Sequence, residues 1–298
     1  MVSTFPRDVT VFLVAGAAKA GTTSIWNALR RHPECHMREV KELHYFDKLC
    51  FGHPDRRAAL NRRIQETESR RSWRISERRR NRGIIRDCRD WLGAFDGRTR
   101  DDDAYLDYLL DGRTSQTVIG EATPAYATLP EPMMHEVAGL TPTLKIQFVM
   151  RDPIERLWSH ICMAARGQAR DGAGTKELAL GLVRETLDEK APAFARASDY
   201  RGIVTRIKAA FERSNRLLSF FETLFYPRGF AAISDFLGIS AFRQTEERNV
   251  LNQGRKIEMP GDVRQSLACY LRPQYEFVDR MFGALVPASW SCPEERTL

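Results

Sequence analysis

A glycine-containing loop between an apolar run and a helical pattern constrains the fold of this chain more than any other feature. Residues 11–24 read VFLVAGAAKAGTTS. The β-branched run Val9–Val14 predicts a buried parallel strand, and a helical pattern begins at about Thr22. A turn of this kind aims backbone N–H groups and the positive end of a helix at one point. The loop therefore predicts a binding site for a phosphate or sulfate group.

The spacing of the loop nearly matches the phosphate-binding pattern GxxxxGK[ST], with one charge displaced. Thr22 occupies the position of the lysine, and Lys19 lies inside the loop instead. This displacement argues against a magnesium-dependent NTPase and favours another phosphate chemistry. The alternative is a tight turn that binds nothing, but the lysine and three consecutive hydroxyl residues favour an anion site. The residues expected to line it are Lys19, Ala20, Gly21, Thr22, Thr23 and Ser24.

The positive charge of the chain is concentrated in one segment. Residues 53–100 hold 15 arginines and seven acidic residues, whereas the whole chain of 298 residues carries +7. We expect a solvated basic helix from Arg70 to Arg82, with Trp73 and Trp91 as apolar anchors. It is either a charged face or an electrostatic funnel for an anionic partner. No nucleic-acid-binding motif accompanies it, so nucleic acid is not the expected partner.

Further patterns place the chain in the α/β class. Three more apolar runs predict strands (Thr117–Gly120, Leu144–Met150, Arg216–Phe221), and helical periodicity covers about 104–111, 153–169, 175–190, 199–213, 229–237 and 261–283. This alternation predicts one domain over residues 1–298, with a three-layer, mainly parallel sheet and helices on both faces. No apolar run is long enough to span a membrane, no signal sequence is evident, and the six cysteines form no CxxC pair, so we expect a cytoplasmic protein without a metal site.

A second polar cluster follows the run Leu144–Met150. RDPIERLWSH, residues 151–160, begins with Arg151 at the expected end of the strand, and Ser159 lies about two helical turns further on. An arginine and a hydroxyl in this arrangement can hold a second phosphate. The alternative is an arginine that caps a neighbouring helix. Because ligands gather at the carboxyl ends of parallel strands, both clusters are expected to face one crevice.

Together the two clusters resemble sulfotransferases that use 3′-phosphoadenosine 5′-phosphosulfate (PAPS), most closely the heparan-sulfate-type, carbohydrate-modifying branch. Residues 19–23 resemble the loop that binds the 5′-phosphosulfate, and Arg151 and Ser159 fall where the family binds the 3′-phosphate. The resemblance continues in KELHYFD (41–47), GEATPAY (120–126) and NQGRKIEMP (252–260). It implies that Gly254, Arg255 and Lys256 close over the nucleotide.

The resemblance also implies a metal-independent in-line transfer to a hydroxyl or amine, with PAP as the product. Lys19 would stabilise the leaving phosphate, and Glu42 matches the position of the base. His44 is the alternative base, expected on the same side of an extended segment, and Asp47 completes the set. Glu121 is expected to orient Lys19 or the acceptor. Tyr126 is either an acceptor contact or a packing residue, and the segment SDYRG (198–202) could line the acceptor cleft.

The chain departs from the family pattern at two positions. Ala122 and Gln253 stand where the family has lysines. These two departures leave the predicted nucleotide donor unchanged. The expected acceptor is a glycan or glycolipid. Two other readings remain open: a P-loop nucleoside or small-molecule kinase, which would need Mg²⁺, and a polyanion-binding protein without catalysis, whose binding would depend steeply on salt.

Overall fold

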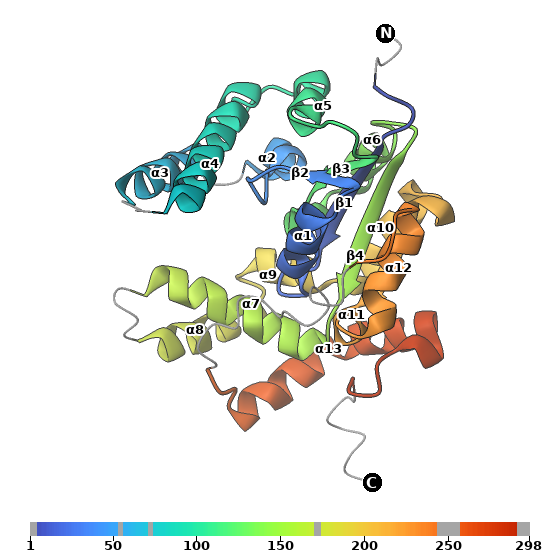
Figure 1. Cartoon of the computed structure of the whole chain (residues 1–298). Helices are drawn as coiled ribbons and strands as arrows, with labels where there is room; N and C mark the ends of the chain where they lie inside the picture. The colour runs from blue at the N-terminus through green and yellow to red at the C-terminus, as the bar shows by residue number, and fades with distance from the viewer. Residues whose placement is uncertain (1–4, 53–55, 71–73, 170–173, 243–256, 291–298) are drawn as a thin grey trace.

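Five parallel strands form the sheet of the computed structural model, which describes residues 5–52, 56–70, 74–169, 174–242 and 257–290 (Figure 1). The strands are β1 (Thr10–Gly16), β2 (Cys35–Met37), β3 (Val118–Glu121), β4 (Leu144–Met150) and β5 (Arg216–Phe220), in the order β2-β3-β1-β4-β5. The four predicted strands are confirmed to within two residues at each end. β2 was not predicted.

Helices connect the strands, and those predicted from periodicity are present, with ends that differ from the predicted ones by at most three residues. They are α1 (Thr22–Arg31), α2 (Tyr45–Phe51), α3 (Arg56–Ser69), α4 (Ile75–Ala94), α5 (Asp102–Leu110), α6 (Glu131–Ala138), α7 (Pro153–Gln168), α8 (Thr175–Leu187), α9 (Pro192–Ser198), α10 (Tyr200–Ala210), α11 (Phe221–Leu224), α12 (Pro227–Leu237) and α13 (Gly261–Phe282), with 3₁₀ turns η1 (Pro124–Thr128), η2 (Arg213–Asn215) and η3 (Gly283–Leu285). The short helices α2, α6, α9 and α11 were not predicted.

Side chains of β4 show that helices cover both faces of the sheet. Successive residues of a strand point to opposite faces. Phe148 meets the ring of Tyr200 in α10, whereas Lys145 lies over the ring of Phe236 in α12. Positions 145 and 148 have opposite parity, so α10 and α12 lie on opposite faces. The predicted α/β fold with helices on both faces is therefore confirmed.

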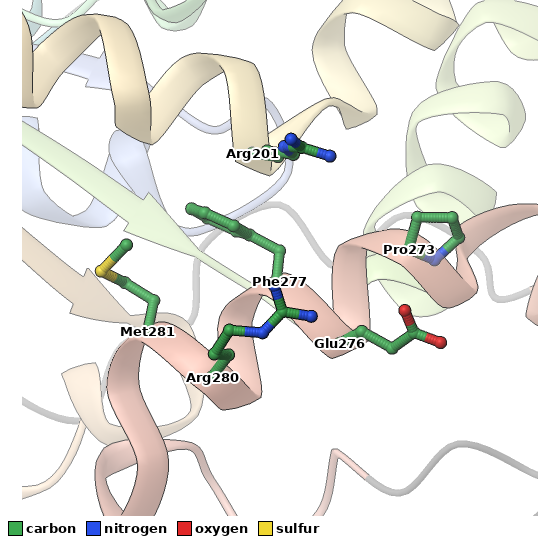
Figure 2. A pocket seen from close by; sticks show the side chains of 6 residues that line it. All are labelled: Arg201, Pro273, Glu276, Phe277, Arg280 and Met281. Carbon is green, nitrogen blue, oxygen red and sulfur yellow. The ribbon is translucent and has the colours of Figure 1, made fainter.

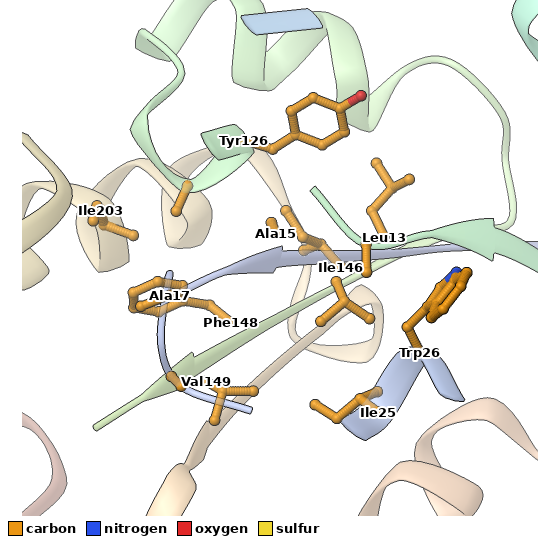
Figure 3. Close-up of a cluster of buried hydrophobic side chains, with 14 of the residues drawn as sticks. Leu13, Ala15, Ala17, Ile25, Trp26, Tyr126, Ile146, Phe148, Val149 and Ile203 are labelled. Carbon is orange, nitrogen blue, oxygen red and sulfur yellow. The ribbon is translucent and has the colours of Figure 1, made fainter. Parts of the chain in front are cut away.

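The core is densest around the two central strands, β1 and β4 (Figure 3). Leu13 pairs in register with Ile146, and both are buried together with Ile25 from the first turn of α1. Burying an aliphatic side chain of this kind contributes about 1.5–3 kcal/mol. The packing fixes the start of α1 against the carboxyl ends of β1 and β4.

The basic segment, residues 53–100, differs from its prediction. Two helices, α3 and α4, replace the single helix from Arg70 to Arg82, and they lie side by side (Figure 1). Arg71 and Trp73 lie outside the described residues. Trp91 is buried as expected and packs against Phe95 and Tyr108. One edge of the segment is therefore part of the core.

Strand order locates the crevice. From β1 the chain passes to β2 and β3 on one side of the sheet and then crosses to β4 and β5 on the other. Ligands of open α/β sheets bind at such a switch point, beyond the carboxyl ends of the strands. Here those ends are the loop after Gly16 and residue Arg151.

Candidate active site

The loop between β1 and α1 presents backbone N–H groups at the crevice. Gly21 precedes the first turn of α1 in the left-handed region, with φ 83°, and no side chain caps the helix. The amide of Ser24 donates to the carbonyl of Gly21, whereas no backbone bond in the described chain uses the amides of Thr22 and Thr23. A helix start with available amides attracts anions.

Arg151 lies directly against this loop. One Nη1–H donates to the carbonyl oxygen of Lys19 over 3.0 Å, and the guanidinium lies 5.0 Å from the centre of the Phe221 ring. The hydroxyl of Tyr200 donates to the carbonyl of Arg151 at 2.7 Å. The two sequence clusters therefore meet, as predicted.

Three positive side chains gather here, and none of them forms a direct ion pair in the described part of the chain. They are Lys19, Arg151 and Arg156. Burial, followed by the charge of Arg151, lowers the pKa of the Lys19 ammonium. Arg156 is completely buried and donates to the hydroxyl of Ser198. Uncompensated buried cations are costly, so this site favours an anionic ligand.

Glu42, His44 and Asp47 form a chain of titratable groups next to the loop. Asp47 Oδ2 lies 2.7 Å from His44 Nδ1, and His44 Nε2 lies 3.7 Å from Glu42 Oε2. Lys41 Nζ donates to Glu42 Oε1 at 2.5 Å. Burial alone would raise the pKa of the Glu42 carboxyl, but the bonds from His44 and Lys41 outweigh it and lower that pKa to about 2. Glu42 also acts electrostatically on Lys19.

The backbone of these residues is strained. Lys19, Glu42 and His44 have φ of 70°, 63° and 55°, and in the described chain the only other non-glycine residue with positive φ is Glu189. Left-handed conformations cost such residues about 1–3 kcal/mol each and cluster at functional sites. Segment 41–44 is therefore not extended, contrary to expectation, although the side chains of Glu42 and His44 do lie on one side.

Glu121 and Tyr126 support that turn, and the buried Tyr126 fits the packing role that was one of its two expected roles. Glu121 is buried and accepts four hydrogen bonds, from Leu43 N (3.2 Å), Tyr105 Oη (2.9 Å), Thr123 Oγ1 (2.5 Å) and Tyr126 Oη (2.6 Å). Tyr126 is also buried, and its hydroxyl accepts from the amide of Tyr45 at 3.0 Å. Glu121 has no bond to Lys19, so it holds the 42–45 backbone instead.

The remaining predicted residues fall into two groups. Ser159 is half-buried in α7, on the helix that Arg151 precedes, whereas Gly254, Arg255 and Lys256 lie outside the described residues. In the SDYRG segment, Ser198 binds Arg156 and Tyr200 holds the backbone of Arg151. These two residues therefore hold Arg156 and Arg151 in place, and the role of the segment in an acceptor cleft stays a prediction.

Two residues at the site were not singled out in the sequence. The ring of Phe221, at the start of α11, lies beside Gly21, where an added Cβ would come within 3.1 Å of it. His160 accepts from Arg156 Nη1 at 3.4 Å, and burial with the Arg156 charge lowers its pKa to about 3. Its ring is therefore neutral at pH 7. Only their places in the sequence could have indicated these two residues: Phe221 follows the end of β5, and His160 follows Ser159.

A hollow outside this site contains one residue of the predicted SDYRG segment, Arg201. This hollow of about 360 Å³ lies between α10 and α13, lined by Arg201, Phe277 and Arg280 among others (Figure 2). Among the described residues, no group of three or more histidine, cysteine or acidic side chains is placed to hold a metal ion. In that same part of the chain, no helix is long and apolar enough to cross a membrane.

The fold is similar to solved sulfotransferase structures. A sulfotransferase from Alicyclobacillus acidocaldarius superposes with a TM-score of 0.60 at 22% identity, over 91% of this chain and 95% of that chain. A sulfotransferase domain from a Synechococcus olefin synthase (TM-score 0.46, 13% identity, 89% and 96% covered) and a sulfotransferase from Mycobacterium avium (0.46, 14%, 94% and 78%) are more distant. No protein-family model and no curated protein matches the sequence. At this identity the first similarity establishes a shared fold.

Proposed function

We propose that this chain is a sulfotransferase that moves a sulfuryl group from PAPS to a hydroxyl or amine of an acceptor and releases PAP. One observation carries the proposal: Lys19, Arg151 and Arg156 converge at the carboxyl ends of β1 and β4, and none of the three forms an ion pair within the described residues. A nucleotide with phosphate groups at two positions supplies several negative charges for such a site.

The residues present fit this donor. The amides at the start of α1 and the Lys19 ammonium suit the phosphosulfate end. Arg151 suits a second phosphate, and the half-buried ring of Phe221 beside it offers an apolar face to the base. The fold similarity and the sequence resemblance support the same assignment.

PAPS supplies the sulfuryl group and a phosphate leaving group. Charge develops on the departing oxygen, and a fixed cation near it lowers the barrier. Lys19 is the proposed cation, because it lies in the loop before α1 and its carbonyl is held by Arg151. The lowered pKa of Lys19 also makes it a better proton donor to that oxygen.

Glu42 is the proposed acceptor of the proton released by the attacking group. Carboxylate oxygens face both ring nitrogens of His44, that of Asp47 at 2.7 Å and that of Glu42 at 3.7 Å. In this proposal His44 and Asp47 orient Glu42, and His44 is the alternative base. A carboxyl with a pKa of about 2 is ionised at pH 7 but weakly basic. Proton transfer to it therefore occurs late, when the acceptor oxygen has become acidic.

The acceptor is proposed to be a carbohydrate or glycoconjugate, on the resemblance of residues 41–47 and 120–126 to the heparan-sulfate-type branch. Ala122 is buried, and its carbonyl accepts from the amide of Glu42. This chain lacks the family lysine at position 122, but the backbone contact of that residue with the candidate base does not depend on the side chain.

Transfer from ³⁵S-labelled PAPS to a panel of glycans, with EDTA present, tests the proposal. We expect labelled product from the wild type and at least a ~100-fold loss in Glu42→Gln, with binding of PAP retained. Transfer of a γ-phosphate from ATP in Mg²⁺, with no transfer from PAPS, would support the kinase instead. Salt-dependent glycan binding with neither transfer would support the non-catalytic alternative.

A further inference from the structure

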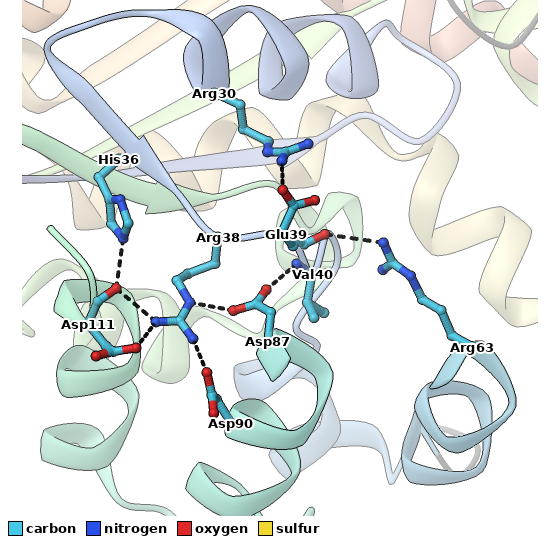
Figure 4. Close-up of polar contacts among 9 residues, drawn as sticks. All are labelled: Arg30, His36, Arg38, Glu39, Val40, Arg63, Asp87, Asp90 and Asp111. Carbon is cyan, nitrogen blue, oxygen red and sulfur yellow. Dashed lines mark hydrogen bonds and ion pairs between the residues drawn. The ribbon is translucent and has the colours of Figure 1, made fainter. Parts of the chain in front are cut away.

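Arg38 is the centre of a buried ionic cluster outside the proposed site (Figure 4). The residue is 7% exposed. Its guanidinium donates to Asp87 and, at 2.7 Å, to Asp90, both in α4, and to the carboxylate and carbonyl of Asp111 at 2.5 and 2.8 Å. Its face also lies 4.4 Å from the centre of the Tyr108 ring. The guanidinium of this buried arginine is thus held by three aspartates and one aromatic ring.

Asp87 differs from Asp90 and Asp111 in its contact with the main chain and in its deeper burial. Its second carboxylate oxygen accepts from the backbone amide of Val40 at 2.6 Å, so it binds the side chain of Arg38 and the main chain two residues further on. Asp87 is itself buried. A buried carboxylate that accepts both bonds fixes the course of residues 38–40.

The other helix of the basic segment contacts the same stretch of chain. Arg63 of α3 donates to the carbonyl oxygen of Glu39 at 3.3 Å, and the carboxylate of Glu39 pairs with Arg30 of α1 (Figure 4). Arg79 and Arg80, by contrast, are exposed on α4. Part of the basic surface of this segment is therefore exposed to solvent. Its buried Asp87 instead faces the stretch of chain that leads to Glu42.

The strained turn begins two residues after Val40. The amide of Glu42 donates to Ala122 O at 3.2 Å, and that of Leu43 donates to Glu121. The end of β3 thus holds the downstream half of the turn, and α4 holds the upstream half. Left-handed residues persist only where both flanks are fixed.

We propose that Asp87 is a positioning residue that, through Arg38 and Val40, holds the turn bearing Glu42 and His44. The basic segment is then a brace for this turn, whatever its outer face binds. The inference rests on the proposed function for its catalytic meaning, but its structural content can be measured separately.

Asp90 provides a matched control, because it also pairs with Arg38 but does not bind the Val40 amide. Hydrogen–deuterium exchange of a peptide covering residues 38–45 would be compared for the wild type, Asp87→Ala and Asp90→Ala, with the affinity for PAP measured on each. We expect exchange at residues 40–45 to accelerate at least ~10-fold in Asp87→Ala and less than ~2-fold in Asp90→Ala. The Kd for PAP should stay within ~3-fold in both. With any acceptor that the wild type sulfates, kcat should fall at least ~10-fold in Asp87→Ala with little change in the KM for PAPS.

Equal exchange in the two variants would overturn the proposal, as would a loss of PAP binding equal to the loss of kcat. If Asp87→Ala does not fold, Asp87→Asn keeps the volume of the side chain and is compared with Asp90→Asn by the same criterion. A wild type that does not bind PAP would refute the proposed function, while the exchange comparison would still decide whether Asp87 holds the turn.

Discussion

Replacing Tyr126 with phenylalanine removes one buried hydroxyl and tests whether this residue supports the turn or contacts the acceptor. That hydroxyl donates to the Glu121 carboxylate at 2.6 Å and accepts from the Tyr45 amide at 3.0 Å. A hydrogen bond to a charged group contributes about 1.5–3 kcal/mol, and a buried amide left without a partner costs about 1–3 kcal/mol. Glu121 keeps three other donors, so the two losses do not add fully. We expect the free energy of unfolding to fall by about 3 kcal/mol.

Urea unfolding followed by circular dichroism measures this change. With an m-value of about 3 kcal/mol/M, the midpoint should fall by ~1 M. Tyr226→Phe is the control, because Tyr226 is 65% exposed and its loss of a hydroxyl should change stability by less than ~0.5 kcal/mol. The affinity for PAP should be unchanged in both variants. A midpoint shift in Tyr126→Phe no larger than in Tyr226→Phe would refute the assignment of Tyr126 to the support of the turn.

Three further changes test the anion site and the packing around it. Gly21→Ala should cost about 1–3 kcal/mol of stability in urea unfolding, because φ is 83° and the added Cβ would lie 3.0 Å from Leu224. The same variant should bind PAP at least ~10-fold more weakly, and unchanged affinity would contradict the loop assignment. The affinity for PAP should fall as the pH rises toward 10.5, because protonated Lys19 binds the anion and the pKa of Lys19 is lowered. Calorimetry on Lys19→Arg should show this fall only at higher pH. Trp91→Ala should destabilise the protein by about 3–5 kcal/mol in thermal or urea unfolding, and a loss below ~1 kcal/mol would show that the basic segment is not packed on the core.

The sequence predicted the central elements because strand and helix periodicities there are undisturbed. Leu144–Met150 is a mostly apolar run that forms β4 with the predicted bounds, and Pro153, three residues after its end, begins α7. β2 was missed because three residues, Cys35–Met37, are too few to show a period. Its neighbour in the sheet, β3, is what makes it a strand.

The basic segment was predicted less well because charge concealed its packing. Fifteen arginines in residues 53–100 suggested a solvated helix, whereas the informative residues were the acidic ones within that run. Asp87 lies three residues from Asp90 on one face of α4, and both meet Arg38, 49 and 52 residues away. A contact at that separation leaves no local pattern in a single sequence.

The sequence predicted that the two clusters of the candidate site meet, but not their geometry. Lys19, Glu42 and Arg151 do come together, yet nothing in the amino-acid sequence indicates that Lys19, Glu42 and His44 all adopt positive φ. Long-range hydrogen bonds in which Glu121 and Asp87 accept from backbone amides hold the turn that bears Glu42 and His44 and the chain that leads to it. Their donors and acceptors become neighbours only when the sheet has formed.

Calorimetric titration with PAP, in EDTA, on the wild type and on Arg151→Ala tests the central claim most directly. The account predicts micromolar binding to the wild type and a loss of at least ~10-fold in Arg151→Ala, because a charge-assisted bond at the switch point is removed. No binding of PAP by the wild type, or equal binding by both proteins, would contradict it.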